Sequence, residues 1–311
     1  MSKISLIIPC FNEEAALVPF MEEIDKVTSS MLPDTVELIF VDDGSRDSTL
    51  GLLRKLSKEN SNIHYLSFSR NFGKEAAMLA GLGAATGDYA AVMDVDLQDP
   101  PALLPEMLHA VRHEGYDCAG TRRVSRRGEP PIRSFFARMF YKLINYVSDT
   151  KLVDGARDYK LMSRPVLDAL VAMPEYHRFS KGLYEWVGFK TKWLEFENVE
   201  RVAGETKWSF WKLFKYSIEG LVAFTTMPLS IASLLGIFFM LFSFILILLL
   251  CIRQLVWHQS VYGWTSMVCI IIFFSGIQLF SLGIIGQYLA KTYMEVKRRP
   301  HFIIKEMDSL S

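Results

Sequence analysis

Tyr89-Ala-Ala-Val-Met93, followed by Asp94-Val-Asp96-Leu-Gln98-Asp99, is the stretch that decides the fold of the larger part of this chain. Its first half is short and continuously apolar, which predicts a buried strand. Alternate residues of an extended segment point the same way, so Asp94 and Asp96 should lie side by side. Two such carboxylates are costly to bury without a cation. A divalent ion, Mg²⁺ or Mn²⁺, would neutralise them, take a carbonyl oxygen from Gln98 and bind substrate phosphate. The alternative is a solvated acidic turn.

The same kind of apolar run recurs before and after this stretch, alternating with segments of helical period. Continuous apolar strands separated by helices predict a parallel sheet that is covered on both faces. The strands are predicted at 4–8, 36–41, 63–67, 89–93 and 116–119, and the helices at 13–27 with Asn12 as N-cap, 48–59, 74–85 and 101–113.

Three of the predicted strands end in polar clusters, at 9–13, 42–47 and 94–99. Ligands of such sheets bind beyond the carboxyl ends of the strands, so we expect the three clusters to form one site. A dinucleotide site is disfavoured. The glycine-rich segment 81–87 has GxGxxxG spacing and precedes a strand, whereas the pyrophosphate fingerprint follows one. Close helix packing, with Gly87 as a C-cap, explains these glycines.

Composition divides the chain into a polar part and an almost uncharged part. The 311 residues include 34 basic and 34 acidic ones, which argues against a nucleic-acid-binding protein. Residues 229–252 and 264–290 carry no charge, and each stretch is long enough to cross a membrane. Basic residues flank both stretches on their outer sides, while the linker 253–263 has only Arg253. The positive-inside rule therefore predicts two transmembrane helices with both termini in the cytoplasm.

Several motifs occur in order along the polar part. Those at 9–14, 41–49, 71–74 and 93–100 resemble the inverting family-2 glycosyltransferases with the GT-A fold. The motifs at 155–164 and 201–208, followed by two apolar stretches, resemble the polyprenyl-phosphate glycosyltransferases. The bacterial bactoprenol (undecaprenyl-phosphate) glucosyltransferases of the O-antigen-modifying type are closest, and the dolichol-phosphate mannose synthases are more distant. The family often has Gly-Asp-Phe-Arg where this chain has Arg157-Asp158-Tyr159-Lys160.

The resemblance implies a role for individual residues. The base and ribose of the nucleotide donor would be held by Pro9, Phe11, Glu13, Val41 and Asp43, with Asp94 at the nucleotide's diphosphate. Asp94, Asp96 and Gln98 would hold the metal. Asp158 matches the family's base, and Asp96 and Asp158 are the expected catalytic residues. A phosphate acceptor is mostly ionised at neutral pH, so Asp158 could orient groups as much as remove a proton.

An anionic acceptor beside acidic side chains requires cations, and arginine matches phosphate oxygens well. The candidates are Arg122, Arg123, Arg126, Arg201 and Lys207, although the run at 122–127 could be a solvated loop. Segments 132–147 and 208–221 mix aromatic, apolar and basic residues, which is typical of interfacial helices, with core packing as the alternative.

The expected protein is thus a membrane-bound enzyme that transfers glucose from UDP-glucose to undecaprenyl phosphate for modification of cell-envelope glycans. Galactose, N-acetylglucosamine, mannose and aminoarabinose donors stay open, as do a polysaccharide synthase and a nucleotide-sugar sensor. Relatives suggest a homo-oligomer, with a tetramer as one option. The predicted order is a cytoplasmic GT-A domain (1–206), a juxtamembrane helix (207–228), the transmembrane helices and their loop as above, and a cytoplasmic basic tail (291–311).

Overall fold

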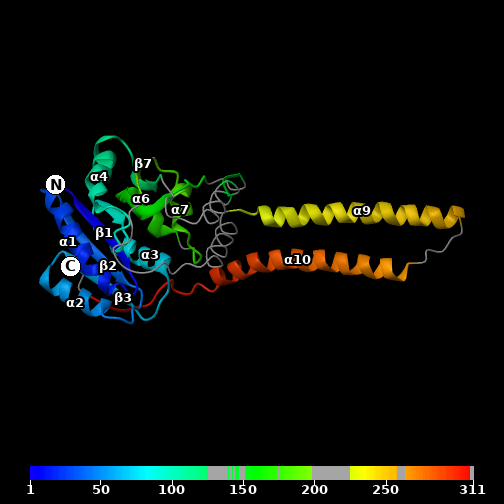
Figure 1. The fold of residues 1–311 in the computed structure, drawn as a ribbon, viewed down its shortest axis with the longest axis horizontal. Coiled ribbons are helices and arrows are strands. Elements are labelled where there is room, and N and C mark those ends of the chain that lie inside the picture. Colours follow the sequence, from blue (N-terminus) through cyan, green and yellow to red (C-terminus); the bar gives the residue numbers. More distant parts are fainter. Residues whose placement is uncertain are drawn as a thin grey trace. The chain divides into compact units, whose positions relative to one another are not determined.

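The computed structural model describes residues 1–124, 139, 142, 144–146, 151–173, 175–197, 225–257 and 263–308. Their contacts divide the chain into two units (Figure 1). One unit contains residues 1–220 together with 299–311, and the other contains residues 221–298. The first unit is an α/β domain, and the second consists of two long helices.

An eight-stranded sheet runs through the first unit in the order β7-β5-β6-β4-β1-β2-β3-β8. Neighbouring strands from β4 to β3 are parallel, as are β5 and β7, whereas β6 and β8 run antiparallel to their neighbours. The strands are β1 (Lys3–Cys10), β2 (Thr35–Asp42), β3 (Ile63–Phe68), β4 (Tyr89–Val92), β5 (Cys118–Arg123), β6 (Ala156–Ser163), β7 (Thr191–Phe196) and β8 (Ile304–Met307).

Helices cover both faces of this sheet. Ile4, Leu6 and Ile8 of β1 face a core that also contains residues of α1, α2 and α4. On the other face, α3 packs so closely that a Cβ on Gly81 would lie 2.3 Å from the side chain of Ile7. The helices of this unit are α1 (Glu14–Ser30), α2 (Thr49–Glu59), α3 (Lys74–Ala84), the 3₁₀ helix η1 (Pro101–Leu103), α4 (Leu104–His113), α6 (Arg164–Ala172) and α7 (Ser180–Trp186).

The predicted mainly parallel sheet of the GT-A class is confirmed, and so are the positions of the first five strands and four helices. Close packing at Gly81 is confirmed as well. Two predicted caps are wrong. Glu13 occupies the N-cap of α1, because Asn12 adopts a left-handed backbone (φ 54°) and its side-chain oxygen accepts the N–H of Arg46. Helix α3 ends at Ala84, with Ala85 rather than Gly87 as its cap.

The end of the chain returns to the sheet edge formed by β3. Strand β8 pairs antiparallel with β3, and Glu306 accepts two hydrogen bonds of 2.7 Å from Arg54 on α2. The ring of Phe302 stacks on that of Phe68 with centroids 5.0 Å apart. The segment that follows the second long helix therefore belongs to the first unit, where β8 is an edge strand of the sheet.

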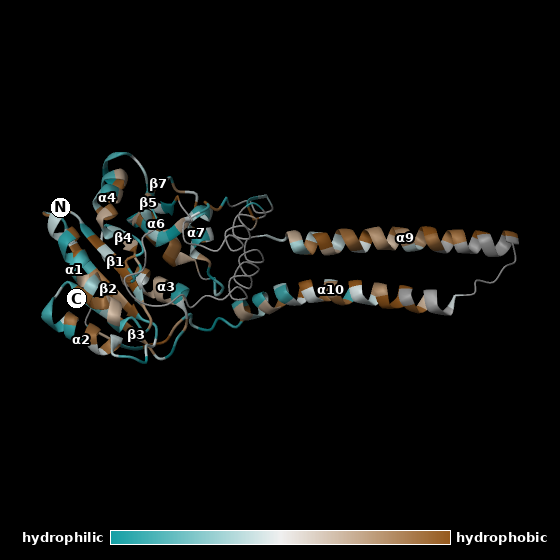
Figure 2. Cartoon of the chain, viewed as in Figure 1, coloured by the Kyte–Doolittle hydropathy of each residue, from teal (hydrophilic) through white to brown (hydrophobic). Residues whose placement is uncertain are grey.

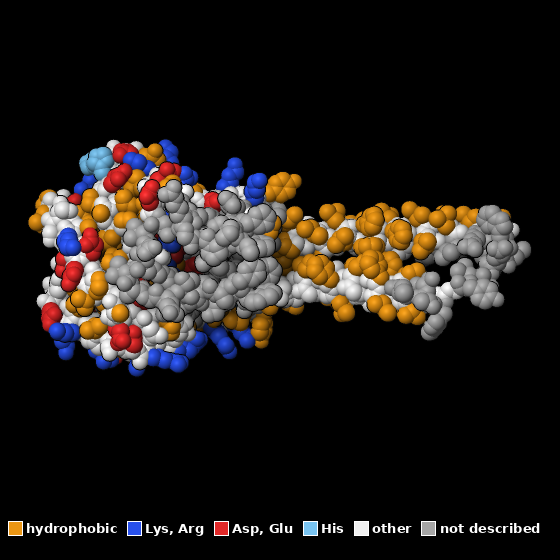
Figure 3. Space-filling view, in the orientation of Figure 1, with side chains coloured by type: hydrophobic (Ala, Val, Ile, Leu, Met, Phe, Trp, Pro, Cys, Tyr) orange, Lys and Arg blue, Asp and Glu red, His pale blue; other side chains and the backbone are white. Residues whose placement is uncertain are grey.

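The second unit contains α9 (Met227–Trp257) and α10 (Trp264–Val296). Both helices are apolar along most of their described length (Figure 2), and the windows Met227–Leu246 and Ile270–Val296 are long and apolar enough to cross a membrane. Their exposed side chains are largely hydrophobic, whereas the first unit's surface carries Lys, Arg, Asp and Glu (Figure 3). The helices contact each other through the ring of Phe239, which packs against those of Phe273 and Phe274.

Candidate active site

Hydrogen bonds join the loops that follow β1 and β2. The N–H of Asn12 donates to Ser45 Oγ, and the N–H of Glu13 donates to Thr49 Oγ1, both at 2.9 Å. The N–H of Asp43 donates to the carbonyl of Cys10 at 2.8 Å. The structure thus brings the polar clusters at 9–13 and 42–47 together, as the parallel arrangement of β1 and β2 requires.

Asp43 holds a third loop against these two. Its carboxylate accepts the N–H groups of Phe72 and Gly73, at 2.6 and 2.9 Å. Gly44 lies against that loop with φ +70°. A Cβ at this position would be 2.5 Å from the backbone of Arg70, so only glycine fits here. Asp43, predicted to bind the nucleotide, therefore also orders the backbone that leads into α3.

The other predicted nucleotide residues line the same loops. Pro9, Phe11 and Glu13 are partly exposed, whereas Val41 is fully buried. The Val41 side chain faces α3, since a Cβ on Gly81 would lie 3.2 Å from it. Any contact of Val41 with a nucleotide therefore has to use its backbone.

Lys74, the first residue of α3, joins Asp94, predicted to bind the metal and the diphosphate, to Asp158, predicted to be catalytic. Its ammonium lies 2.7 Å from Asp94 Oδ1 and 2.5 Å from Asp158 Oδ2. Asp94 follows β4 and Asp158 lies on β6, and these strands are antiparallel neighbours. Both acids thus lie where the parallel strands have their carboxyl ends, and the first turn of α3 supplies a cation between them.

The charges of this cluster shift the pKa values of its members. Burial opposes a charged Lys74, but Asp158 and Asp94 outweigh it and raise the pKa of the ammonium. Burial likewise works to raise the pKa of Asp158, yet Lys74 and Lys181 hold it well below the usual range. Asp158 is therefore an anion at neutral pH and only a weak base.

The donor set at the ends of β4 and β6 fits a hard divalent cation. Asp94 and Asp158 already share one cation, the Lys74 ammonium. Asp96 and Gln98 lie on the same bend, where the N–H of Gln98 donates to Asp96 Oδ1 at 3.2 Å. Among the described residues no group of three or more His, Cys, Asp or Glu is arranged to hold a metal. An ion here would need further oxygens, and a nucleotide diphosphate offers them.

Helix α7 contacts α3 next to Lys74 and contacts β6 near Asp158. Glu75, the neighbour of Lys74 on α3, accepts the backbone N–H of Ser180 at 3.1 Å and also its hydroxyl. This contact fixes the first turn of α7, and the next residue, Lys181, donates to the carbonyl of Ala156 at 2.9 Å. Burial raises the pKa of Glu75, and Ser180 only partly offsets this effect.

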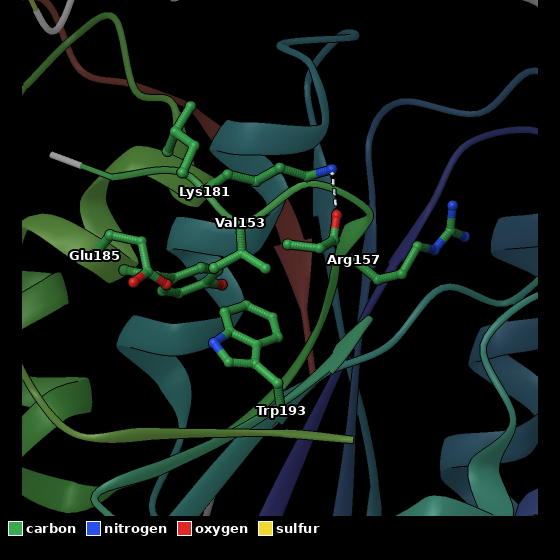
Figure 4. Close-up of a pocket in the computed structure, with 8 residues that line it drawn as sticks. Val153, Arg157, Lys181, Glu185 and Trp193 are labelled. Atoms are coloured by element: carbon green, nitrogen blue, oxygen red, sulfur yellow. Dashed lines mark hydrogen bonds between the residues drawn. The ribbon is translucent and has the colours of Figure 1, made fainter. Parts of the chain in front are cut away.

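A small pocket lies beside β6 and α7 (Figure 4). Trp193 and Glu185 face it from one side, and Lys181 reaches across it to the Ala156 carbonyl. Lys160, which is 1% exposed, lies within 5.0 Å of the ring centre of Tyr184 and 3.4 Å from Glu185. The residue two places after Asp158 is thus a buried, paired cation that anchors α7 to β6.

The predicted acceptor-phosphate residues are only partly described. Arg122 forms an ion pair with Glu195 on the neighbouring strand β7, and Arg123, at the end of β5, is partly exposed. Arg126, Arg201 and Lys207 lie outside the described residues, and so do most of the predicted interfacial helix at 132–147 and residues 207–224 of the juxtamembrane helix.

Sequence reasoning assigned no role to Lys74, Glu75, Lys181 or Arg157. Lys74 offered a signal, because it ends the motif at 71–74. The partnership of Glu75 with Ser180 spans 105 positions and leaves no local pattern.

Comparison with known proteins decides the family. The sequence model of glycosyl transferase family 2 matches residues 5–171. The chain belongs to this family. Among family members, the putative glycosyltransferase CsbB of Bacillus subtilis is 43% identical, with 97% of this chain and 91% of that protein covered. The SfII prophage-derived bactoprenol glucosyl transferase of Shigella flexneri is 38% identical, with 98% of each chain covered.

A third relative and one solved structure are also similar to this chain. The prophage bactoprenol glucosyl transferase homolog of Escherichia coli is 37% identical over 98% of this chain and 99% of that protein. Among solved structures, mannosyl-3-phosphoglycerate synthase from Rubrobacter xylanophilus is 17% identical, with a TM-score of 0.48 and coverage of 71% and 73%. The predicted membership of the glycosyltransferases, next to bactoprenol glucosyl transferases, is confirmed.

Proposed function

We propose that this glycosyltransferase transfers one monosaccharide, glucose from UDP-glucose, to undecaprenyl phosphate at a membrane and inverts the anomeric configuration. The observation that carries the proposal is the placement of Asp94, Asp158 and Lys74 at one sheet edge. The full-length similarity to bactoprenol glucosyl transferases supports the lipid acceptor and the glucose donor. The two apolar helices α9 and α10 support a membrane-bound enzyme.

The donor nucleotide would lie over the loops that Asn12, Glu13 and Asp43 hold together. Hydrogen bonds from backbone N–H groups to side chains of the neighbouring loops order these loops, which lowers the ordering cost of binding. Pro9, Phe11 and the Val41 backbone would then contact the base and ribose. The diphosphate would point towards Asp94, at the end of β4.

A divalent ion would be held by Asp94, Asp96 and Gln98, and its chemistry is to neutralise the charge that grows on the leaving diphosphate. Mg²⁺ and Mn²⁺ both suit carboxylate and carbonyl oxygens. Lys74 provides a positive charge of the chain itself, which pairs with Asp158 as well as with Asp94. Together these groups would stabilise the transition state electrostatically.

The acceptor phosphate carries its own negative charge, because its second pKa is near 6. Asp158 is held in its ionised, weakly basic form by Lys74 and Lys181. We therefore assign Asp158 the role of orienting the acceptor through these cations rather than that of a strong base. The candidate phosphate ligands are Arg122, Arg123, Arg126, Arg201 and Lys207.

For the membrane arrangement we propose cytoplasmic termini, an outward loop at 253–263 and a homo-oligomer such as a tetramer. The polar unit with the active site would then lie where nucleotide sugars are made. The basic residues on the outer flanks of α9 and α10 support this orientation.

The decisive test is a donor panel with the purified full chain, undecaprenyl phosphate and either Mg²⁺ or Mn²⁺. UDP-glucose should give a glucosyl lipid product, and UDP-galactose, UDP-N-acetylglucosamine and GDP-mannose should give much less. Product from another donor would replace glucose while keeping the reaction class. No lipid product with any donor would overturn the proposed function.

A further inference from the structure

The residue directly before Asp158 is Arg157. Its Nε donates a 2.7 Å hydrogen bond to Asp99 Oδ1. The side chain of Asp99 is only 1% exposed, and that of Arg157 is 25% exposed. A buried ion pair therefore lies beside the catalytic residues.

Asp99 depends on Arg157 for its partner. Among the described residues its other oxygen, Oδ2, has no hydrogen-bond partner. A buried carboxylate without a partner is unfavourable, so the hydrogen bond from Arg157 is what offsets the burial of Asp99. The pair is consequently a strong constraint on the two segments that carry it.

These two segments hold opposite halves of the candidate active site. Arg157 belongs to β6, directly before Asp158, whereas Asp99 ends the bend that carries Asp94 and Asp96. That bend contains Leu97 with φ 56°, a conformation that non-glycine residues rarely adopt. A strained bend keeps its shape only when its surroundings hold it.

A second contact also joins β6 to the segment that follows this bend. Tyr159, fully buried, donates a 3.4 Å hydrogen bond from its hydroxyl to the carbonyl of Pro101. Alternate residues of a strand lie on the same face, so Arg157 and Tyr159 share one face of β6 and Asp158 lies on the other. In Figure 4 the guanidinium of Arg157 extends away from Trp193 and the pocket. One face of β6 thus holds the bend, while its opposite face presents Asp158 to Lys74.

We propose that Arg157 and Asp99 are positioning residues, whose ion pair sets the distance between Asp158 and the carboxylates of Asp94 and Asp96. This inference rests on the proposed function, because it takes those carboxylates as the ligands of metal and diphosphate. Neither residue is among the proposed ligands of the metal or the diphosphate. It acts by holding the bend after β4 in register with β6.

The experiment uses the full chain with Arg157→Ala, Asp99→Asn and the double variant Asp99→Asn with Arg157→Ala. Arg112→Ala is the matched control. Arg112 forms an ion pair of 2.8 Å with Asp34, has a side chain 27% exposed, and is not among the proposed site residues. Each protein is measured for melting temperature, for Mn²⁺ affinity in the presence of UDP by electron paramagnetic resonance, and for kcat.

Arg157→Ala should lower kcat by roughly 100-fold, the effect of a displacement of about 1 Å between reacting groups. Its Mn²⁺ affinity should fall by about 10-fold, as for the loss of a residue that orients metal ligands. The double variant should regain melting temperature, because the amide introduced by Asp99→Asn buries no charge, while kcat and Mn²⁺ affinity stay low. Arg112→Ala should lower only the melting temperature.

Recovery of kcat and Mn²⁺ affinity together with melting temperature in the double variant would overturn the inference, and so would an Arg157→Ala variant that behaves like Arg112→Ala. The two proposals fail separately. A wild-type chain that binds Mn²⁺ and UDP but makes no lipid product contradicts the proposed function, while the Mn²⁺ affinities of the variants still decide the role of the ion pair.

Discussion

Replacement of Lys74 by methionine tests whether this lysine occupies the place of the metal's charge. Its ammonium lies 2.7 Å from Asp94 Oδ1 and 2.5 Å from Asp158 Oδ2, so a cation that binds Asp94 has to displace it or share the carboxylate. Methionine has a similar length and no charge. We therefore expect Lys74→Met to bind Mn²⁺ more tightly than the wild type.

The size of the effect follows from the exposure of the three side chains. Lys74 is 40% exposed, and Asp94 and Asp158 are 24% and 21% exposed. Solvent screening at such exposure limits each ion pair to about 1 kcal/mol or less. The two pairs together give about 1–2 kcal/mol, which corresponds to a factor of about 5–30 in the Mn²⁺ dissociation constant.

The assay is a titration of the purified full chain with Mn²⁺ in the presence of UDP, with free Mn²⁺ measured by electron paramagnetic resonance. Lys26→Met is the matched control, because Lys26 pairs with Glu23 on the exposed face of α1. Without metal, Lys74→Met should melt at a lower temperature, since Asp94 and Asp158 then repel each other, and Mn²⁺ should restore it. An Mn²⁺ affinity equal to or weaker than that of the wild type would refute this competition.

Four further outcomes are expected. Asp96→Asn should abolish transfer while the melting temperature is kept, and near-normal turnover at saturating metal would reject its role. Arg201→Ala should weaken the use of lipid phosphate by roughly 10- to 150-fold, the loss of a charge-assisted contact of about 1.5–3 kcal/mol, with UDP-sugar affinity unchanged. The thiol of Ser260→Cys, in a background without native cysteines, should be labelled from outside intact cells; labelling only after lysis contradicts the orientation. Burial works to raise the pKa of Glu37, but the hydrogen bonds that its carboxylate accepts outweigh burial and lower this pKa. Glu37→Gln should therefore reduce the melting temperature at neutral pH, and the difference from the wild type should shrink as the pH falls below about 4.5.

The first five strands could be predicted because each contains a short, mostly apolar run. Strands β1 and β4 are buried on both faces, so nearly all of their side chains are apolar and the pattern is local. The polar clusters that follow these strands could be predicted to meet, because the carboxyl ends of neighbouring parallel strands lie at the same end of the sheet. The hydrogen bonds between the loops at 12–13 and 45–49 agree with that expectation.

Strand β6 could not be predicted in this way, because its sequence reads ARDYKLMS and one of its buried positions is a lysine, Lys160. Lys160 is buried only because Glu185, Tyr184 and Trp193 surround it, and these residues come later in the chain. Strand β8 is short, and its position depends on Arg54, which lies 252 positions away from Glu306. Both strands therefore depend on contacts with residues that are distant in the sequence.

The active-site cluster combines both kinds of information. Asp94 and Asp96 were predictable from a local pattern, whereas the pairing of Lys74 with Asp158 spans 84 positions and that of Arg157 with Asp99 spans 58. Local sequence can therefore indicate candidate carboxylates, but the cations that pair with them come from other strands and helices. Substitutions at Lys74 and Arg157 should for this reason change metal affinity and turnover while the aspartates that define the motif remain in place.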